Sequence, residues 1–134
     1  GTYCAGDTAA PVACAAGTWD HDANAATACE SHSVCAAGHV LAVAGTSTEN
    51  AQCSACAAGT YCAGGEAPAV ACGAANWDDD ASAATPCVDW STCAPGTSVS
   101  STPSATDDRL CTECVAGSFS TTSNASQCEE PSRR

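Results

Sequence analysis

The sequence predicts a small disulfide-rich fold: elongated tandem cysteine-rich repeats with short β-strands and irregular loops, and little or no helix. Three observations predict it. The chain has 13 cysteines in 134 residues, its cysteines recur with a fixed period, and large aliphatic side chains are scarce, with Leu41 and Leu110 as its leucines. Alanine and cysteine supply most of the apolar residues and bury little area, so disulfides must replace the missing core.

The repeat is 58 residues long. The opening Gly1–Cys4 returns as Gly59–Cys62, and a weaker copy follows at Gly117–Phe119. Superposing residues 1–58 on 59–116 without a gap aligns all six cysteines of the first copy with six of the second. A fixed period of this kind predicts units that contact only their neighbours. The predicted domains are cysteine-rich repeat 1 (1–58), cysteine-rich repeat 2 (59–116), and a partial third repeat with a tail (117–134).

Neither copy shows helical periodicity. Glycine, proline, aspartate and serine recur every few residues, which favours turns. We therefore expect small two-stranded ladders joined by irregular loops. The expected strands are Thr2–Tyr3, Val40–Val43, Thr60–Tyr61, Thr97–Ser100 and Ser118–Ser120.

Composition also limits the cellular location of the protein and the classes of partner it can bind. This cysteine density requires an oxidising compartment, so an extracellular or cell-surface location is expected. No signal peptide and no membrane-spanning apolar run is visible, and we expect a mature product or a window of a longer protein. The net charge of −12, with Arg109, Arg133 and Arg134 as the basic residues, excludes a nucleic-acid footprint. Acidity of this kind is compatible with divalent cations or with simple solubility.

Two segments resemble a known family. The loop Cys114–Cys128 resembles the first disulfide loop of a tumour-necrosis-factor-receptor-type cysteine-rich repeat, and Cys93–Cys111 resembles its longer loop. The pattern Cys53–Tyr61 also resembles ephrin-receptor-like cysteine-rich repeats, as in protist- or bacterial-type surface repeat arrays. Cys62 is extra and the longer loop lacks one internal cysteine, so no ligand-contact residue is carried over.

The resemblance implies a disulfide pattern. It implies Cys93–Cys111 and Cys114–Cys128, and the period extends these to the earlier copies. Spacing alone cannot fix the connectivity, and an odd number of cysteines leaves one without an internal partner. We expect Cys14 to be unpaired within the chain, with its partner before the chain begins. The expected pairs are Cys4–Cys29, Cys35–Cys53, Cys56–Cys72, Cys62–Cys87, Cys93–Cys111 and Cys114–Cys128.

Two acidic turns are candidate calcium sites. They fall on equivalent positions of the repeats, and alternating side-chain oxygens resemble the start of a calcium loop. The glycine and glutamate of an EF-hand loop are missing, so an Asx-rich turn is the alternative. No cofactor is required, and calcium stays open. The candidate ligands are Asp20, Asp22, Asn24, Asp78 and Asp80.

The remaining candidates weigh against catalysis. The CxxC pairs Cys53/Cys56 and Cys111/Cys114 could be zinc or redox dithiols, but assignment to separate disulfides explains both. The three histidines lie in different loops, and no Ser-His-Asp order is present. Asn124 begins an N-glycosylation sequon.

These observations predict a non-enzymatic extracellular protein. The leading interpretation is a structural or adhesive repeat module of a surface coat, stalk or filament. The alternative is a receptor-type ligand-binding ectodomain, whose site should break the repeat symmetry, as Trp90, His39 and Val40–Val43 do. Expected partners are further copies or neighbouring repeats of a longer chain. Covalent glycans are also expected, and neither nucleic acid nor a membrane span is.

Overall fold

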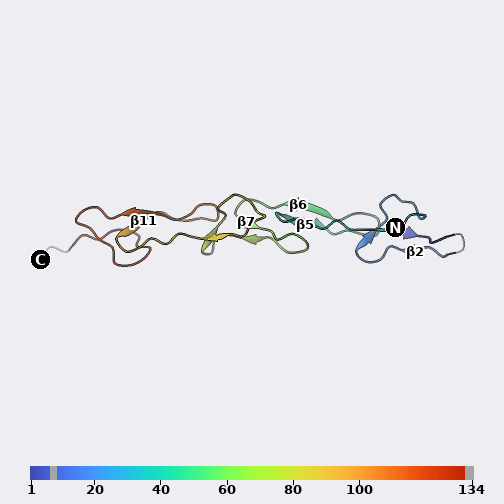
Figure 1. The fold of residues 1–134 in the computed structure, drawn as a ribbon, viewed down its shortest axis with the longest axis horizontal. Coiled ribbons are helices and arrows are strands. Elements are labelled where there is room, and N and C mark those ends of the chain that lie inside the picture. The colour runs from blue at the N-terminus through green and yellow to red at the C-terminus, as the bar shows by residue number, and fades with distance from the viewer. Residues whose placement is uncertain (7–8, 132–134) are drawn as a thin grey trace. The chain divides into compact units, whose positions relative to one another are not determined.

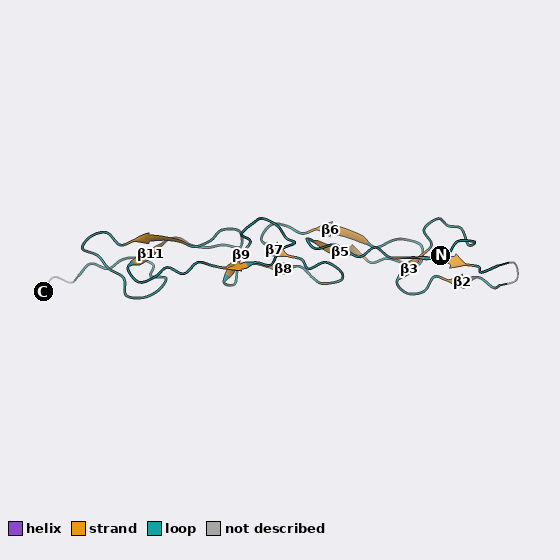
Figure 2. Ribbon diagram, in the orientation of Figure 1, coloured by secondary structure: helices purple, strands orange, loops and turns teal. Residues whose placement is uncertain are grey.

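A computed structural model describes residues 1–6 and 9–131, so the last three residues of the predicted tail lie outside the described part. Every regular element in the described residues is a short β-strand, and the strands pair in antiparallel twos (Figures 1 and 2). This arrangement confirms the predicted fold class of tandem cysteine-rich repeats with short strands.

Each repeat contains three two-stranded ladders. In the first repeat β1 (Thr2–Tyr3) pairs with β2 (Val12–Ala13), β3 (Thr18–Trp19) with β4 (Glu30–Ser31), and β5 (His39–Val43) with β6 (Gln52–Ala55). In the second repeat β7 (Thr60–Tyr61) pairs with β8 (Val70–Ala71), β9 (Asn76–Trp77) with β10 (Val88–Asp89), and β11 (Thr97–Ser101) with β12 (Leu110–Glu113).

The two repeats share their backbone details. Each strand of the second repeat begins and ends 58 residues after its counterpart. The register shift between Leu41 and Val43 in the β5–β6 ladder recurs between Val99 and Ser101 in the β11–β12 ladder. Since the same sequence pattern gives the same local structure twice, local turn chemistry and disulfides set the conformation.

Cysteines form the core. The buried apolar residues are Cys35, Cys62, Cys72 and Cys93, and Cys62 has no exposed surface. No larger apolar side chain among the described residues is fully buried, and several are exposed: Val34 is 80% exposed. Burying so little aliphatic surface cannot offset the conformational entropy of an ordered chain, so the bridges must carry the stability.

Six disulfides connect twelve cysteines, and Cys4 is the free cysteine among the described residues. Three of the bridges coincide with expected pairs: Cys35–Cys53, Cys93–Cys111 and Cys114–Cys128. The other three correct the expectation. The structure has Cys14–Cys29 in place of Cys4–Cys29, Cys56–Cys62 in place of Cys56–Cys72, and Cys72–Cys87 in place of Cys62–Cys87. Cys14, which was expected to be unpaired, is therefore bonded.

The backbone of Gly38 explains the correction. The Gly38 N–H donates to the carbonyl of Cys62 at 2.8 Å, and its carbonyl accepts from the N–H of Cys56 at 2.9 Å. One residue thus holds both cysteines side by side. With Cys56 and Cys62 joined in a short loop, Cys72 is left for Cys87.

The chain divides into two compact units. Unit 1 comprises Gly1–Cys56 with Cys62–Ala69, and unit 2 comprises Ala57–Tyr61 with Val70–Arg134. The segment after Cys62 belongs to unit 1 through the Cys56–Cys62 bridge. Among the described residues no helix is long and apolar enough to span a membrane.

Candidate functional site: a pocket in the first repeat

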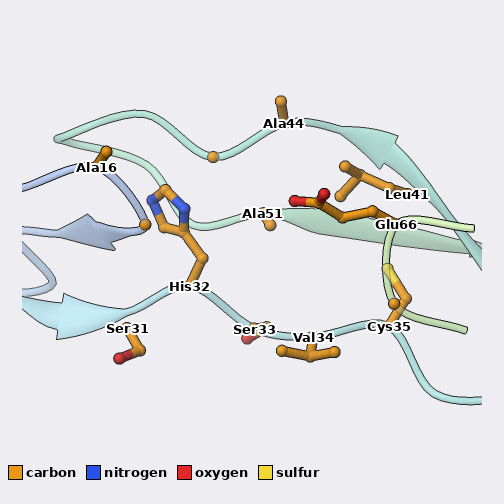
Figure 3. A pocket seen from close by; sticks show the side chains of 13 residues that line it. Ala16, Ser31, His32, Ser33, Val34, Cys35, Leu41, Ala44, Ala51 and Glu66 are labelled. Atoms are coloured by element: carbon orange, nitrogen blue, oxygen red, sulfur yellow. The ribbon is translucent and has the colours of Figure 1, made fainter.

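Unit 1 contains a pocket of about 580 Å³. Its walls come from the chain between β4 and β5, from the turn between β5 and β6, and from the segment after Cys62 (Figure 3). The lining is mostly small or apolar, with a histidine and a glutamate as its ionisable side chains. The lining residues are Ala16, Gly17, Ser31, His32, Ser33, Val34, Cys35, Leu41, Ala44, Gly45, Ala51, Gly65 and Glu66.

His32 forms one side of the pocket. Its Nε2 lies 2.9 Å from the carbonyl oxygen of Thr46, and since a carbonyl only accepts, Nε2 carries the hydrogen. The ring lies against Gly45, where an added Cβ would come within 2.5 Å of it. Any side chain at position 45 would therefore displace the ring.

Ser33 and Asn50 fix the floor of the pocket. The Ser33 N–H donates to Asn50 Oδ1 at 2.7 Å, and Asn50 Nδ2 donates to the Ser33 hydroxyl at 2.8 Å. The second repeat has the same clasp, with Asp108 accepting from the N–H and the hydroxyl of Ser91. The Ser91 hydroxyl is the largest cause that lowers the pKa of Asp108. In both repeats the clasp thus holds the backbone N–H and the hydroxyl of the serine.

Glu66 closes the opposite side. Gly64 has φ +85°, and a Cβ there would lie 2.7 Å from the carbonyl oxygen of Cys35. The chain can therefore pass close to Cys35, where the Gly65 N–H donates to that carbonyl at 2.7 Å. In Figure 3 the Glu66 carboxylate extends toward Ala51. Within the described residues this carboxylate makes no hydrogen bond or ion pair, so it is available to a ligand.

The second repeat fills the equivalent place with its own side chain. Arg109 stands 58 residues after Ala51. Its Nη1 donates to the Ser91 carbonyl and to Asn124 Oδ1, both at 2.8 Å, and its guanidinium carbon lies 5.8 Å from the Trp90 ring centroid. The space that is open in the first repeat is thus occupied by a guanidinium in the second.

His32 and Trp90 occupy equivalent positions and make equivalent bonds. Trp90 Nε1 donates to the Ser104 carbonyl at 3.0 Å, and Ser104 is the counterpart of Thr46, which binds His32. Their backbones also agree, since the His32 N–H donates to Gly17 and the Trp90 N–H to Ala75, each at 2.9 Å. The two rings are therefore held at equivalent positions of the repeats.

The predicted calcium ligands serve as turn caps. Asp22 Oδ1 accepts from the Thr27 hydroxyl at 2.7 Å and from the Asn24 N–H at 3.0 Å. The Thr27 bond is the main cause of the lowered pKa of Asp22. In the second repeat Asp80 Oδ1 accepts from the Thr85 hydroxyl and the Ser82 N–H, both at 2.9 Å. Within the described residues no group of three His, Cys, Asp or Glu side chains could hold a metal ion.

Asp78 is the buried member of this set, 6% exposed. Its Oδ2 accepts from the Gly59 N–H at 2.9 Å, and its Oδ1 from the Ser82 N–H at 3.1 Å. The Gly59 bond is the largest cause that lowers the pKa of Asp78, against the opposing effect of burial. Asp20 is joined to Ser47 by its backbone N–H at 2.9 Å. Calcium binding by Asp20, Asp22, Asn24, Asp78 and Asp80 stays a prediction.

The structure brings few of the other candidates together. The members of each CxxC pair lie in different bridges, so neither pair offers free thiols for zinc or redox chemistry. His21 lies 3.6 Å from Glu30, away from the pocket-lining His32, and His39 lies on β5. Asn124 is exposed with its side-chain oxygen bonded, and N-glycosylation there stays a prediction.

Sequence reasoning missed Ala51, Glu66 and Arg109. The sequence singles out Trp90 as a place where the repeats differ, and the residue at the equivalent position of the first repeat is His32. The signal that could have found the site is another difference between the two aligned repeats. Arg109 is the only arginine in residues 1–116, and the equivalent position of the first repeat is Ala51.

The repeat architecture defines the class: a tandem, disulfide-linked cysteine-rich repeat protein. Residues 14–53 match the family described as the TNFR/NGFR cysteine-rich region, which confirms the predicted resemblance. The match begins and ends on bridged cysteines and contains Cys14–Cys29 and Cys35–Cys53. The segments that suggested the resemblance, Cys93–Cys111 and Cys114–Cys128, lie outside the matched residues, and each is closed by its expected bridge.

Among solved structures, a chain of the crystal structure titled mouse RANKL-OPG complex is similar to this one. The identity is 16%, the alignment covers 84% of this chain and 98% of that chain, and the TM-score is 0.35. Comparison with curated proteins gives no match.

Proposed function

We propose that this chain is a receptor-type ligand-binding ectodomain, an extracellular module that binds another protein and catalyses no reaction. One observation carries the proposal: the pocket is lined mainly by residues of the repeat that matches the TNFR/NGFR cysteine-rich region, with Gly65 and Glu66 added from the segment after Cys62. At this place Ala51 stands where the second repeat has Arg109. The six bridges fit the oxidising compartment in which an ectodomain works.

The test is direct binding. The bridged chain is biotinylated, offered to secreted and cell-surface proteins, and each captured protein is then purified and remeasured by biolayer interferometry. We expect one purified partner to bind saturably with a Kd of about 1 μM or tighter, and to lose binding when the bridges are reduced. If every purified candidate fails to bind the intact chain, the receptor proposal is wrong.

A structural or adhesive role is the second candidate, and one observation favours it. Val12 of β2 and its counterpart Val70 of β8 are 64% and 56% exposed. An apolar side chain exposed at the same place in both repeats fits a contact that recurs along an assembly of copies. Negative-stain microscopy and sedimentation test it: fibres or large oligomers would support this role, and a monomer at high concentration would contradict it.

A further inference from the structure

We propose that the pocket of the first repeat binds an arginine side chain presented by a partner protein, in the place that Arg109 fills in the second repeat. This inference rests on the proposed receptor function and names the chemistry of its ligand. The second repeat supplies the template, because its Arg109 is bound by a serine carbonyl, a side-chain oxygen and an aromatic ring.

The first repeat keeps the same receptor groups and lacks the arginine. Ser33 is held by the same clasp as Ser91, and its backbone carbonyl is the equivalent of the one that binds Arg109. The His32 ring stands in place of the Trp90 ring, and its Nε2 donates to the Thr46 carbonyl as Trp90 Nε1 donates to the Ser104 carbonyl. Ala51 replaces Arg109 and leaves the space open, so a guanidinium from outside can occupy it.

Glu66 strengthens the case for a cation. In the second repeat Arg109 bonds to the neutral amide of Asn124, whereas the segment after Cys62 offers a carboxylate at the pocket wall. The guanidinium already makes a charge-assisted hydrogen bond to an amide oxygen, and a carboxylate in that place adds the attraction of an opposite charge. A planar, forked guanidinium can bond a carboxylate and a carbonyl together and can stack on a flat ring, and a lysine ammonium cannot do all three.

Charge favours an arginine from another protein. The chain carries a net charge of −12, which attracts basic partners. Of its three arginines, Arg109 is already bonded in the second repeat, and Arg133 and Arg134 lie outside the described residues. The same arginines on a second copy of the chain are the competing occupant, and the test below separates the two.

The experiment uses the full bridged chain labelled with ¹⁵N. An acetylated and amidated glycine–arginine–glycine peptide is titrated in, beside peptides with lysine or citrulline at the centre. We expect the arginine peptide to shift the resonances of His32, Ser33 and Ala51 at millimolar concentration, with the other two peptides at least about tenfold weaker. No shift, or equal shifts with all three, overturns the proposal.

Variants locate the site. Ala51→Arg should fill the pocket from within, as Arg109 does, and abolish peptide binding; a bridge map by mass spectrometry checks its fold. Glu66→Gln should weaken binding by about tenfold, and because Glu66 is exposed this variant tests the proposal even if Ala51→Arg misfolds. Glu113→Gln removes an exposed carboxylate from unit 2 and should leave peptide binding unchanged. Unaltered peptide binding in folded Ala51→Arg or in Glu66→Gln overturns the proposal.

The outcomes separate this inference from the receptor proposal. A purified partner that binds Ala51→Arg as tightly as the unmodified chain overturns the arginine pocket and leaves the receptor proposal standing. Arginine-peptide binding by a chain that captures no protein contradicts the receptor proposal alone. Self-association that Ala51→Arg abolishes places an arginine of a second copy in the pocket and overturns the assignment to a partner.

Discussion

Arg109 should stabilise the second repeat as an internal ligand, and Arg109→Ala removes it. The substitution deletes two charge-assisted hydrogen bonds, to the Ser91 carbonyl and to Asn124 Oδ1, and one contact with the Trp90 ring. Arg109 is half-buried, so we take about 0.75 kcal/mol for each hydrogen bond and about 0.5 kcal/mol for the ring contact. The expected loss is therefore about 2 kcal/mol of local stability.

Native-state hydrogen exchange measures that loss with an internal control. The Trp90 N–H donates to the Ala75 carbonyl in unit 2, and the equivalent His32 N–H donates to the Gly17 carbonyl in unit 1. In Arg109→Ala the Trp90 amide should exchange about 30-fold faster, because a loss of about 2 kcal/mol in the free energy of local opening changes the exchange rate by that factor. The His32 amide should not change, because the lost bonds all lie in unit 2.

Two further variants sharpen the result. Arg109→Lys keeps the charge but loses the forked geometry, so it should recover less than half of the protection. Val115→Ala truncates a side chain that is 75% exposed and should leave the Trp90 amide within about twofold. The reasoning is refuted if Arg109→Ala leaves Trp90 exchange unchanged, or if Arg109→Lys protects as well as arginine. In either case the guanidinium would not be held by the groups around it.

Three other predictions follow from the bridges and the carboxylates. The lowered pKa of Asp78 means that its ionised form stabilises the fold above the unfolded-state pKa of about 3.9, and that this contribution is lost as the pH falls through the folded pKa. A carboxyl-carbon NMR titration should give a midpoint below that of Asp78 in the urea-unfolded chain, and an equal midpoint contradicts the Gly59 bond. Non-reducing peptide mapping should recover Cys56 linked to Cys62, and a link from Cys56 to any other cysteine refutes the structure there. Because Oδ1 of Asp22 already caps a turn, adding a chelator should leave the melting temperature unchanged, whereas a lower melting temperature would establish calcium binding.

The period and the composition together predict the fold class. Short strands are expected at Thr2–Tyr3 and at the equivalent Thr60–Tyr61, and β1 and β7 lie there. Composition predicted the absence of an aliphatic core, and the buried residues are mainly cysteines. Both features are local or compositional, so a single sequence contains them.

Half of the bridges could not be predicted, for a physical reason. Extending Cys114–Cys128 by the period reaches Val70, two residues short of Cys72. The partial third copy also has Ser120 at the position of Cys62. There the Gly96 N–H donates to the Ser120 carbonyl at 3.0 Å, as Gly38 does to Cys62, but no thiol is present and Cys114 bonds Cys128 instead. The third copy was therefore the wrong template for the first two.

A fold held by bridges leaves its other positions free to differ. In a fold with an aliphatic core, replacing an arginine by alanine next to a tryptophan changes packing that the whole domain shares. Here the core is cysteine, and Ala51 and Arg109 stand at equivalent places on backbones with the same strands and the same bulge. Filling or emptying the space beside Ala51 or Arg109 therefore changes local stability only. Under this condition the second repeat can hold its own arginine while the first binds the arginine of a partner protein.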